Sequence, residues 1–333
     1  MKDLIKRLTE AYGPSGSEDQ VRQIIVEEIA GTVDQTSVDA LGNLVAIKRG
    51  AGPRVMLAAH MDEIGVVISH IDEKGFVRFA PVGGVYPETL TGQRVKFANG
   101  LEGVIGSEPR ESRSEEIKLS KLFIDVGVDG RDAAEAVDKV GQFATFWREF
   151  QEVNRRFVSK AMDDRLGCAI LVQLLKELKT SPNELLCVFT AQEEVGPRGA
   201  MTSAYAANPM LAIAVDVTTT GDTPESKPMA VSLGKGPAIK VKDSGMLTHP
   251  SVRQMLIDTA VEAGIPYQIE VLEGGSTDGA VIQTTRSGIP TGVLSVPCRY
   301  VHTPSEMVDK DDVQNAVRLL LHLLSRRLDG GHG

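Results

Sequence analysis

The sequence is poor in aromatic residues, and its basic residues are outnumbered by acidic ones. Aromatic residues make up 5% of the 333 residues, so the chain offers few side chains that stack on nucleic-acid bases. The formal net charge of -9 opposes binding to a polyanion, because phosphate contacts come from Lys and Arg. The composition therefore predicts that the protein has no nucleic-acid partner.

The sequence also lacks long apolar runs. No segment approaches the roughly 20 consecutive apolar residues that cross a bilayer, which predicts no membrane partner. The first residues, Met1–Lys6, enter an amphipathic helix without the apolar core of a signal peptide. Cysteine is scarce, and Cys168, Cys187 and Cys298 are widely spaced among apolar neighbours, as is typical of buried thiols in a reducing compartment. We therefore expect a cytoplasmic protein.

What the sequence does contain is an alternation of helix and strand patterns, interrupted by a strand-rich block. The apolar run at 54–59 is typical of a strand buried on both faces, and residues 66–158 hold many short strand-like segments separated by turn signals. From residue 159 onward, helix and strand patterns alternate again. Helices are predicted near 2–12, 18–30, 164–179, 198–207, 250–263, 279–286 and 309–328, and further strands at 185–190, 211–217, 267–271 and 291–296.

This pattern predicts an α/β fold with an inserted domain. Alternating helices and strands imply a mixed, mostly parallel sheet with helices on both faces. We assign this α/β domain to residues 1–65 and 159–333 and the small β-rich insert to residues 66–158. The second helix is expected to be capped by Ser17, and the glycine-rich tail, residues 330–333, is expected to be flexible.

Acidic residues and histidines follow the predicted strands of the sheet, where open parallel sheets bind their ligands. A further acidic residue, Asp163, stands just before a helix where the chain re-enters the larger domain. Because clustered carboxylates repel one another unless cations neutralise them, this convergence predicts a metal site. The candidates are His60, Asp62, Asp163, Glu193, Glu194, Asp216 and His302.

The number and type of candidates favour two cations. A catalytic zinc ion takes three protein ligands and keeps one position for water, whereas five or six candidates are present here. Imidazoles combined with carboxylates suit zinc, cobalt or manganese better than calcium or magnesium. If one carboxylate bridges, two cations lie a few Å apart with a hydroxide between them. One acid of the pair Glu193-Glu194 would then bind metal while its neighbour serves the water as a general base.

Five segments of the sequence resemble the tetrahedral-assembly (TET) and glutamyl aminopeptidase family of two-metal peptidases. The resemblance extends over nearly the whole chain, and the segments occur in the family's order. They are Ala59-His60-Met61-Asp62-Glu63-Ile64-Gly65, Lys160-Ala161-Met162-Asp163-Asp164-Arg165, Gln192-Glu193-Glu194-Val195-Gly196, Val215-Asp216 and His302-Thr303-Pro304-Ser305-Glu306.

The resemblance implies a role for each candidate. His60 and Asp216 would bind one metal, Glu194 and His302 the other, and Asp163 would bridge the two. Glu193 would act as general base and acid, and Asp62 would orient the His60 ring. The bond between Asp163 and Asp164 would be cis. In this family the insert is PDZ-like and contributes to homo-oligomers, often dodecamers with interior active sites that admit peptides.

The resemblance further implies cleavage of the N-terminal peptide bond of peptides, with two divalent ions, zinc or cobalt, as cofactors. The loop Gly274–Gly279 resembles a family segment near the site, which suggests that Gly275 and Asp278 bind substrate. A plain turn capped by Thr277 or Asp278 explains this loop equally well.

Other functions remain open from the residues alone. A carboxypeptidase or deacylase on the same two-metal scaffold would carry the same ligands. A non-catalytic, metal-stabilised oligomeric scaffold would not need Glu193. A glucanase, as some members of the family are labelled, fits poorly, because glycosidases ordinarily need only two flanking carboxylates. This chain instead has its acidic residues alongside histidines, and it has one Trp with which to stack sugars.

Overall fold

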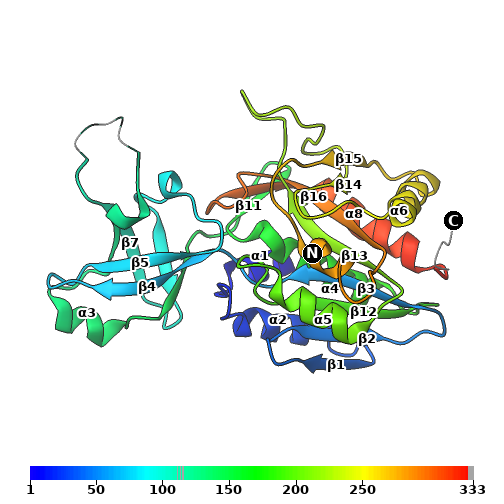
Figure 1. Ribbon diagram of the computed structural model, residues 1–333, viewed down its shortest axis with the longest axis horizontal. Coiled ribbons are helices and arrows are strands. Elements are labelled where there is room, and N and C mark those ends of the chain that lie inside the picture. The colour runs from blue at the N-terminus through cyan, green and yellow to red at the C-terminus, as the bar shows by residue number, and fades with distance from the viewer. Residues whose placement is uncertain (111, 113, 115, 329–333) are drawn as a thin grey trace.

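The protein consists of a large helix-covered sheet and a smaller β-barrel beside it (Figure 1). The computed structural model describes residues 1–110, 112, 114 and 116–328. The predicted flexible tail, residues 330–333, lies outside the described residues. The fold class expected from the sequence, an α/β sheet domain with a small β-rich insert, is confirmed.

The large sheet has four parallel strands at its centre, β12, β3, β13 and β16, and antiparallel strands toward its edges. Its order is β1-β2-β12-β3-β13-β16-β17-β11-β10, with β14 and β15 attached beside β16. The strands are β1 (Gln35–Val38), β2 (Leu44–Lys48), β3 (Arg54–His60), β10 (Gln151–Val153), β11 (Arg156–Ser159), β12 (Glu184–Thr190), β13 (Leu211–Thr218), β14 (Ala238–Lys242), β15 (Gln268–Val271), β16 (Thr291–Arg299) and β17 (Glu306–Asp309).

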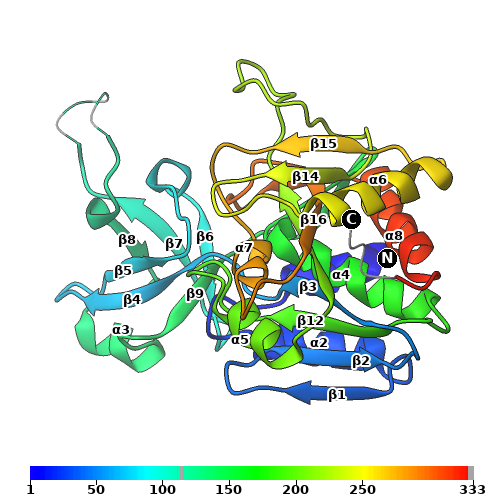
Figure 2. The same cartoon turned by 45° about the vertical axis from the view of Figure 1, so that its right-hand side comes forward.

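Helices cover both faces of this sheet, because the side chains of each strand alternate between its faces. In β3, Val55 and Leu57 belong to the same apolar cluster as residues of α1, α2, α4, α6 and α8, whereas Met56 and Ala58 belong to a second cluster with residues of α5 and α7. Figure 2 shows α2 and α5 beside strands β2 and β12. The helices are α1 (Lys2–Glu10), α2 (Asp19–Ile29), α4 (Met162–Glu177), α5 (Arg198–Ala207), α6 (Pro250–Glu262), α7 (Asp278–Gln283) and α8 (Lys310–Leu324).

The smaller lobe is a closed six-stranded barrel in the order β4-β5-β8-β7-β6-β9. Its own apolar core includes Ile68, Phe79, Val95 and Ile124, so it does not rely on the large sheet to bury its side chains. Its elements are β4 (Gly65–Ile71), β5 (Val77–Val82), η1 (Pro87–Thr89), β6 (Arg94–Phe97), β7 (Glu102–Ser107), η2 (Leu119–Lys121), β8 (Leu122–Asp125), α3 (Arg131–Val137) and β9 (Phe143–Phe146).

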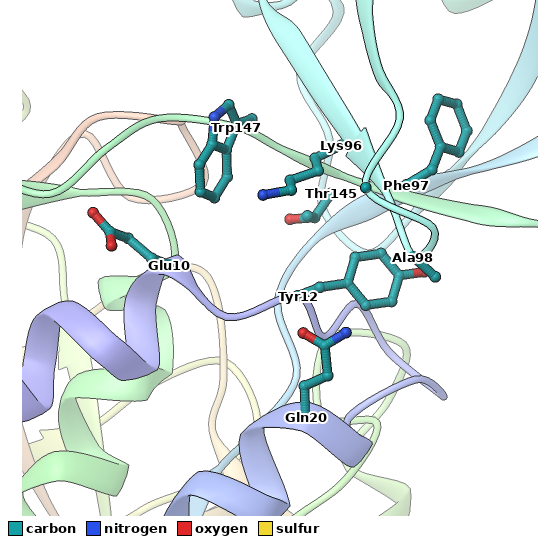
Figure 3. A pocket seen from close by; sticks show the side chains of 9 residues that line it. Glu10, Tyr12, Gln20, Lys96, Phe97, Ala98, Thr145 and Trp147 are labelled. Carbon is teal, nitrogen blue, oxygen red and sulfur yellow. The ribbon is translucent and has the colours of Figure 1, made fainter.

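Polar contacts tie together the two segments through which the chain passes between the lobes, and a further contact joins the lobes themselves. Lys160 donates to both carboxylate oxygens of Glu63, at 2.8 and 2.7 Å, and Arg165 donates to Glu63 at 3.1 Å. Tyr12 donates to the carbonyl of Phe143 in the barrel at 3.0 Å. A pocket opens beside this contact (Figure 3). Its lining consists of Glu10, Tyr12, Gln20, Lys96, Phe97, Ala98, Gly100, Thr145 and Trp147.

Several details differ from the sequence-based expectations. Strands β10 and β11 extend the large sheet, because β11 pairs with β17, so residues 151–158 lie in that sheet rather than in the barrel. Strand β14 was not predicted either. Helix α2 starts at Asp19 with Glu18 rather than Ser17 at the N-cap. The Glu18 carboxylate does not cap the helix and accepts hydrogen bonds from the amides of Gly16 and Gln192.

Two other expectations concern thiols and membranes. The three cysteines are free and buried, as predicted. Within the described part of the chain, no helix has both the length and the apolar character needed to cross a bilayer.

Candidate metal centre

The strand ends of the large sheet bring the predicted site residues together. His60 ends β3, and its register partner Thr190 ends β12 just before Glu193 and Glu194. Asp216 lies in β13, and His302 lies in the turn between β16 and β17. These residues form two groups of potential metal ligands. Within each group, one ligand atom from each residue lies within 4.8 Å of the ligand atoms of the others. The groups are His60, Asp163 and Asp216, and Asp163, Glu194 and His302.

Asp163 belongs to both groups, and its two carboxylate oxygens face different histidines. Oδ1 lies 3.0 Å from Nε2 of His60, and Oδ2 lies 3.4 Å from Nε2 of His302. Nε2 of His302 also lies 3.2 Å from a carboxylate oxygen of Glu194. This arrangement presents one carboxylate between two ligand sets. The bond between Asp163 and Asp164 is cis, as the family resemblance implied.

The electrostatics of the site favour bound cations. Burial and the neighbouring carboxylate of Asp163 raise the pKa of Asp216 well above its usual value, and burial likewise raises the pKa of Glu194. Burial alone would lower the pKa of His302, but hydrogen bonds to Asp163 and Glu194 outweigh it and raise that pKa to about 12. Burial and mutual repulsion therefore oppose ionisation of Asp216 and Glu194 in the protein alone. Cations would relieve the same repulsion.

The donor set fits divalent transition metals. Two imidazoles and three carboxylates converge, which suits zinc or cobalt. Oε1 of Glu194 is buried without a hydrogen-bond partner among the described residues, so a ligand atom is left without the partner that a buried oxygen requires.

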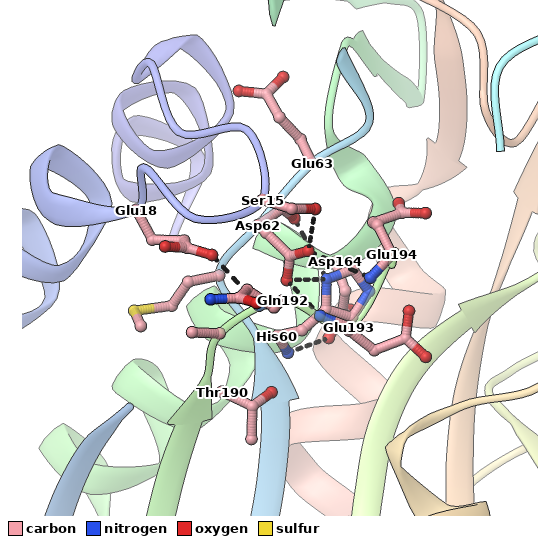
Figure 4. Close-up of polar contacts among 12 residues, drawn as sticks. Ser15, Glu18, His60, Asp62, Glu63, Asp164, Thr190, Gln192, Glu193 and Glu194 are labelled. Atoms are coloured by element: carbon pink, nitrogen blue, oxygen red, sulfur yellow. Dashed lines mark hydrogen bonds and ion pairs between the residues drawn. The ribbon is translucent and has the colours of Figure 1, made fainter. Parts of the chain in front are cut away.

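Asp62 anchors the loop that carries the two glutamates (Figure 4). Its fully buried carboxylate accepts hydrogen bonds from the amides of Glu193 and Glu194, at 2.9 and 3.1 Å, and from the hydroxyl of Ser15 at 2.6 Å. It also contacts His60, whose Nδ1 lies 3.1 Å from the Asp62 carbonyl and 3.4 Å from Oδ1. Asp62 thus contacts both the loop and the ring.

Sequence reasoning assigned no role to Glu306 or Asp164. The buried Glu306 carboxylate accepts hydrogen bonds from the amides of Asp163 and His302, at 3.0 and 2.8 Å, and so ties together two ligand-bearing segments. Asp164 accepts from the amide of His60 at 3.2 Å and from Gly167 at 3.0 Å. Both residues stand inside the recognised motifs, which is the one sequence signal that marks them.

Asp278 and Gly275 lie differently from each other. Asp278 is buried, accepts a hydrogen bond from Thr190 at 2.6 Å and belongs to the electrostatic surroundings of Glu193. The neighbouring Thr277 caps α7 by accepting from Gly279 at 3.2 Å, as the plain-turn alternative anticipated. Gly275 is exposed, and its carbonyl accepts a hydrogen bond from the amide of Ser244 at 3.1 Å.

The comparisons with known proteins decide the family. The sequence model of the M42 glutamyl aminopeptidase family matches residues 42–319, which include every predicted site residue. The chain belongs to the M42 glutamyl aminopeptidase family. This confirms the resemblance seen in the sequence.

Full-length relatives agree with this M42 membership. A putative aminopeptidase of Acetivibrio thermocellus is 49% identical over 97% of this chain and 98% of its own. An aminopeptidase of the archaeon Desulfurococcus kamchatkensis has a structure with a TM-score of 0.93, 40% identity and coverage of 97% of this chain and 94% of that one. The structure of the TET1 peptidase of Pyrococcus horikoshii matches with a TM-score of 0.89 and 32% identity. This match covers 97% of this chain and 98% of the Pyrococcus horikoshii chain. The M42 chain described here is therefore a peptide hydrolase.

Proposed function

We propose that the protein is a metal-dependent aminopeptidase that removes the N-terminal residue from peptides. His60, Asp163 and Asp216 would hold one divalent ion, and Asp163, Glu194 and His302 the other, with zinc or cobalt as the native metal. The placement of Asp163 between the two histidines, with one carboxylate oxygen toward each, carries this proposal. When bound, the ions supply Lewis-acid chemistry that polarises the scissile carbonyl and lowers the pKa of water.

Glu193 is the proposed general base and acid. Its backbone amide is fixed by Asp62, while its carboxyl group belongs to neither group of candidate ligands. Burial, together with repulsion from Asp278 and Asp216, raises the pKa of Glu193 well above that of an exposed glutamate. A carboxyl group of raised pKa can accept a proton from the attacking water and return it to the leaving nitrogen.

A pair of neighbouring substitutions tests these roles. We expect Glu193→Gln to bind both ions with wild-type affinity and to lose about 10²–10⁴-fold in kcat, the usual contribution of a general base. Glu194→Gln is the matched control, because it should weaken metal binding as well as turnover. Turnover on aminoacyl p-nitroanilides and metal content by atomic absorption are measured in parallel. Near wild-type turnover of Glu193→Gln would refute the assignment of the base.

The reaction class is tested with the N-terminus of the substrate. We expect peptides with a free amine to be cleaved and the same peptides carrying an N-terminal acetyl group to be left intact. Release of acetate or of C-terminal residues would instead identify a deacylase or a carboxypeptidase. A panel of N-terminal residues would define the preference, and variants of Asp278 and Gly275 would test their predicted contact with substrate.

The proposal includes assembly of several copies in the cytoplasm. The Pyrococcus horikoshii relative is described as assembling into a tetrahedron or a large octahedral shell. We propose a comparable homo-oligomer, such as a dodecamer, in which the barrel, the part of the predicted insert that lies outside the large sheet, contributes to assembly and controls peptide access. Light scattering coupled to size exclusion measures the mass directly, and a monomer would contradict this part of the proposal.

A further inference from the structure

The barrel reaches the metal centre through the turn that follows β5. A Cβ atom on Gly84 would lie 2.5 Å from Nδ1 and 2.8 Å from Cε1 of the His302 ring. A Cβ atom on Gly83 would lie 3.1 Å from Cβ of Glu194. The backbone of the turn is therefore in direct contact with side chains of two candidate ligands from the large domain.

The two glycines are required for different reasons. Gly83 has a φ of +80°, a conformation that L side chains rarely adopt, so its backbone alone favours glycine. Gly84 is not among the residues with positive φ, and its backbone conformation does not call for glycine. The space that a side chain at 84 would need is occupied by the His302 ring. Contact with this ring is therefore the feature that excludes a larger residue at position 84.

Both ring nitrogens of His302 face neighbouring groups, and these groups come from different lobes. Nε2 faces Glu194 and Asp163, at 3.2 and 3.4 Å, while the edge with Nδ1 faces Gly84. The backbone amide of His302 is held by Glu306 at 2.8 Å. The ring of Tyr86, from the same turn as Gly84, lies 6.3 Å from the His302 ring, centroid to centroid. The barrel thus forms one wall around this ligand.

We propose that Gly84 is a positioning residue for His302, through which the inserted barrel sets the orientation of one metal ligand. The inference rests on the proposed role of His302 as a ligand. It makes the barrel a structural part of the metal centre, in addition to any role in assembly. A displacement of the barrel relative to the large sheet would then change the binding of the ion assigned to Asp163, Glu194 and His302.

A double-mutant cycle in the metal-free, full-length protein tests the contact itself. We expect Gly84→Ala to lower Tm by about 3 °C or more, because the added methyl group overlaps the ring. In a His302→Ala background the ring is gone, and the same substitution should cost less than half as much. Gly106→Ala is the matched control, since its Cβ would also lie 2.5 Å from an aromatic ring, that of Phe123 within the barrel. Its cost should be the same in both backgrounds. Equal costs of Gly84→Ala in both backgrounds would overturn the proposal.

Metal titration tests the consequence. Cobalt is added to the metal-free protein, and calorimetry and the visible absorption of bound cobalt report each binding step. We expect Gly84→Ala to weaken cobalt binding at the site that includes His302 about 10–100-fold, the usual effect of losing support around a ligand. The absorption spectrum of cobalt at that site should also change. Gly106→Ala should change neither. A wild-type titration of Gly84→Ala would overturn the proposal. If His302→Ala itself bound two ions like the wild type, His302 would not be a ligand and the proposed function would be contradicted. The double-mutant cycle would still test the contact between Gly84 and His302.

Discussion

Replacement of Asp62 by Asn gives a stringent test of how the loop that carries Glu193 and Glu194 is held. The Asp62 carboxylate accepts three hydrogen bonds, from the amides of Glu193 and Glu194 and from the hydroxyl of Ser15, and it is fully buried. An Asn side chain offers one oxygen, and its NH₂ group cannot accept from a backbone N–H. At least one of the loop amides would therefore lose its acceptor.

The expected cost follows from these contacts. A hydrogen bond to a charged group contributes about 1.5–3 kcal/mol, and a buried donor left without an acceptor costs about 1–3 kcal/mol. We expect Asp62→Asn to reduce the free energy of unfolding by about 2–4 kcal/mol. Because the amide of Glu193 is one of the groups released, kcat should also fall, by about 10²-fold for a displacement near 1 Å.

The assay compares Tm of the metal-free protein with kcat of the metal-loaded protein. Ser15→Ala is the control, because it removes one donor and leaves the Asp62 carboxylate available to both amides. Its effects should be clearly smaller, about 1 kcal/mol in stability. If Asp62→Asn unfolded and turned over like the wild type, the loop would be held by other contacts and the reasoning would be refuted.

Two further predictions concern other polar contacts. The amides of Asp163 and His302 donate to different carboxylate oxygens of Glu306, and a Gln side chain has only one oxygen. Glu306→Gln should therefore weaken metal binding about 10–100-fold in calorimetric titration. Unchanged binding would contradict the positioning role of Glu306. Asp222 bonds Arg299 with two hydrogen bonds of 2.9 Å; burial opposes ionisation, yet this pairing prevails and lowers the pKa of Asp222 to about 2. Since the folded pKa lies below the unfolded value of 3.8, the stabilisation is complete above about pH 4 and is lost toward pH 2. Asp222→Asn should therefore lose less stability than the wild type over this interval in denaturant melts, and identical acid profiles would contradict the assignment.

The convergence at the metal centre could be predicted from the sequence because parallel strands deliver their last residues to one edge of a sheet. His60 ends such a strand, Glu194 follows one and Asp216 lies near the end of one, and the apolar runs that precede them mark the strands clearly. Asp163 follows none of the four central parallel strands, and its bridging role was inferred from the family resemblance.

Contacts between distant segments could not be predicted in the same way. Ser15 bonds Asp62 across 47 positions, and Gly84 meets His302 across far more, so no local periodicity links either pair. Strand β11 was also missed, since its pairing with β17 depends on how the chain returns from the barrel. Such contacts are set by tertiary packing rather than by propensity.

Metal stoichiometry tests the shared position of Asp163 most directly. Zinc or cobalt bound per chain is counted for the wild type, His302→Ala and Asp163→Asn after extensive dialysis. We predict two ions for the wild type, one for His302→Ala and substantial loss of both for Asp163→Asn, because that carboxylate faces both ligand sets. A wild-type protein that binds a single ion, or an Asp163→Asn variant that keeps two, would contradict the account.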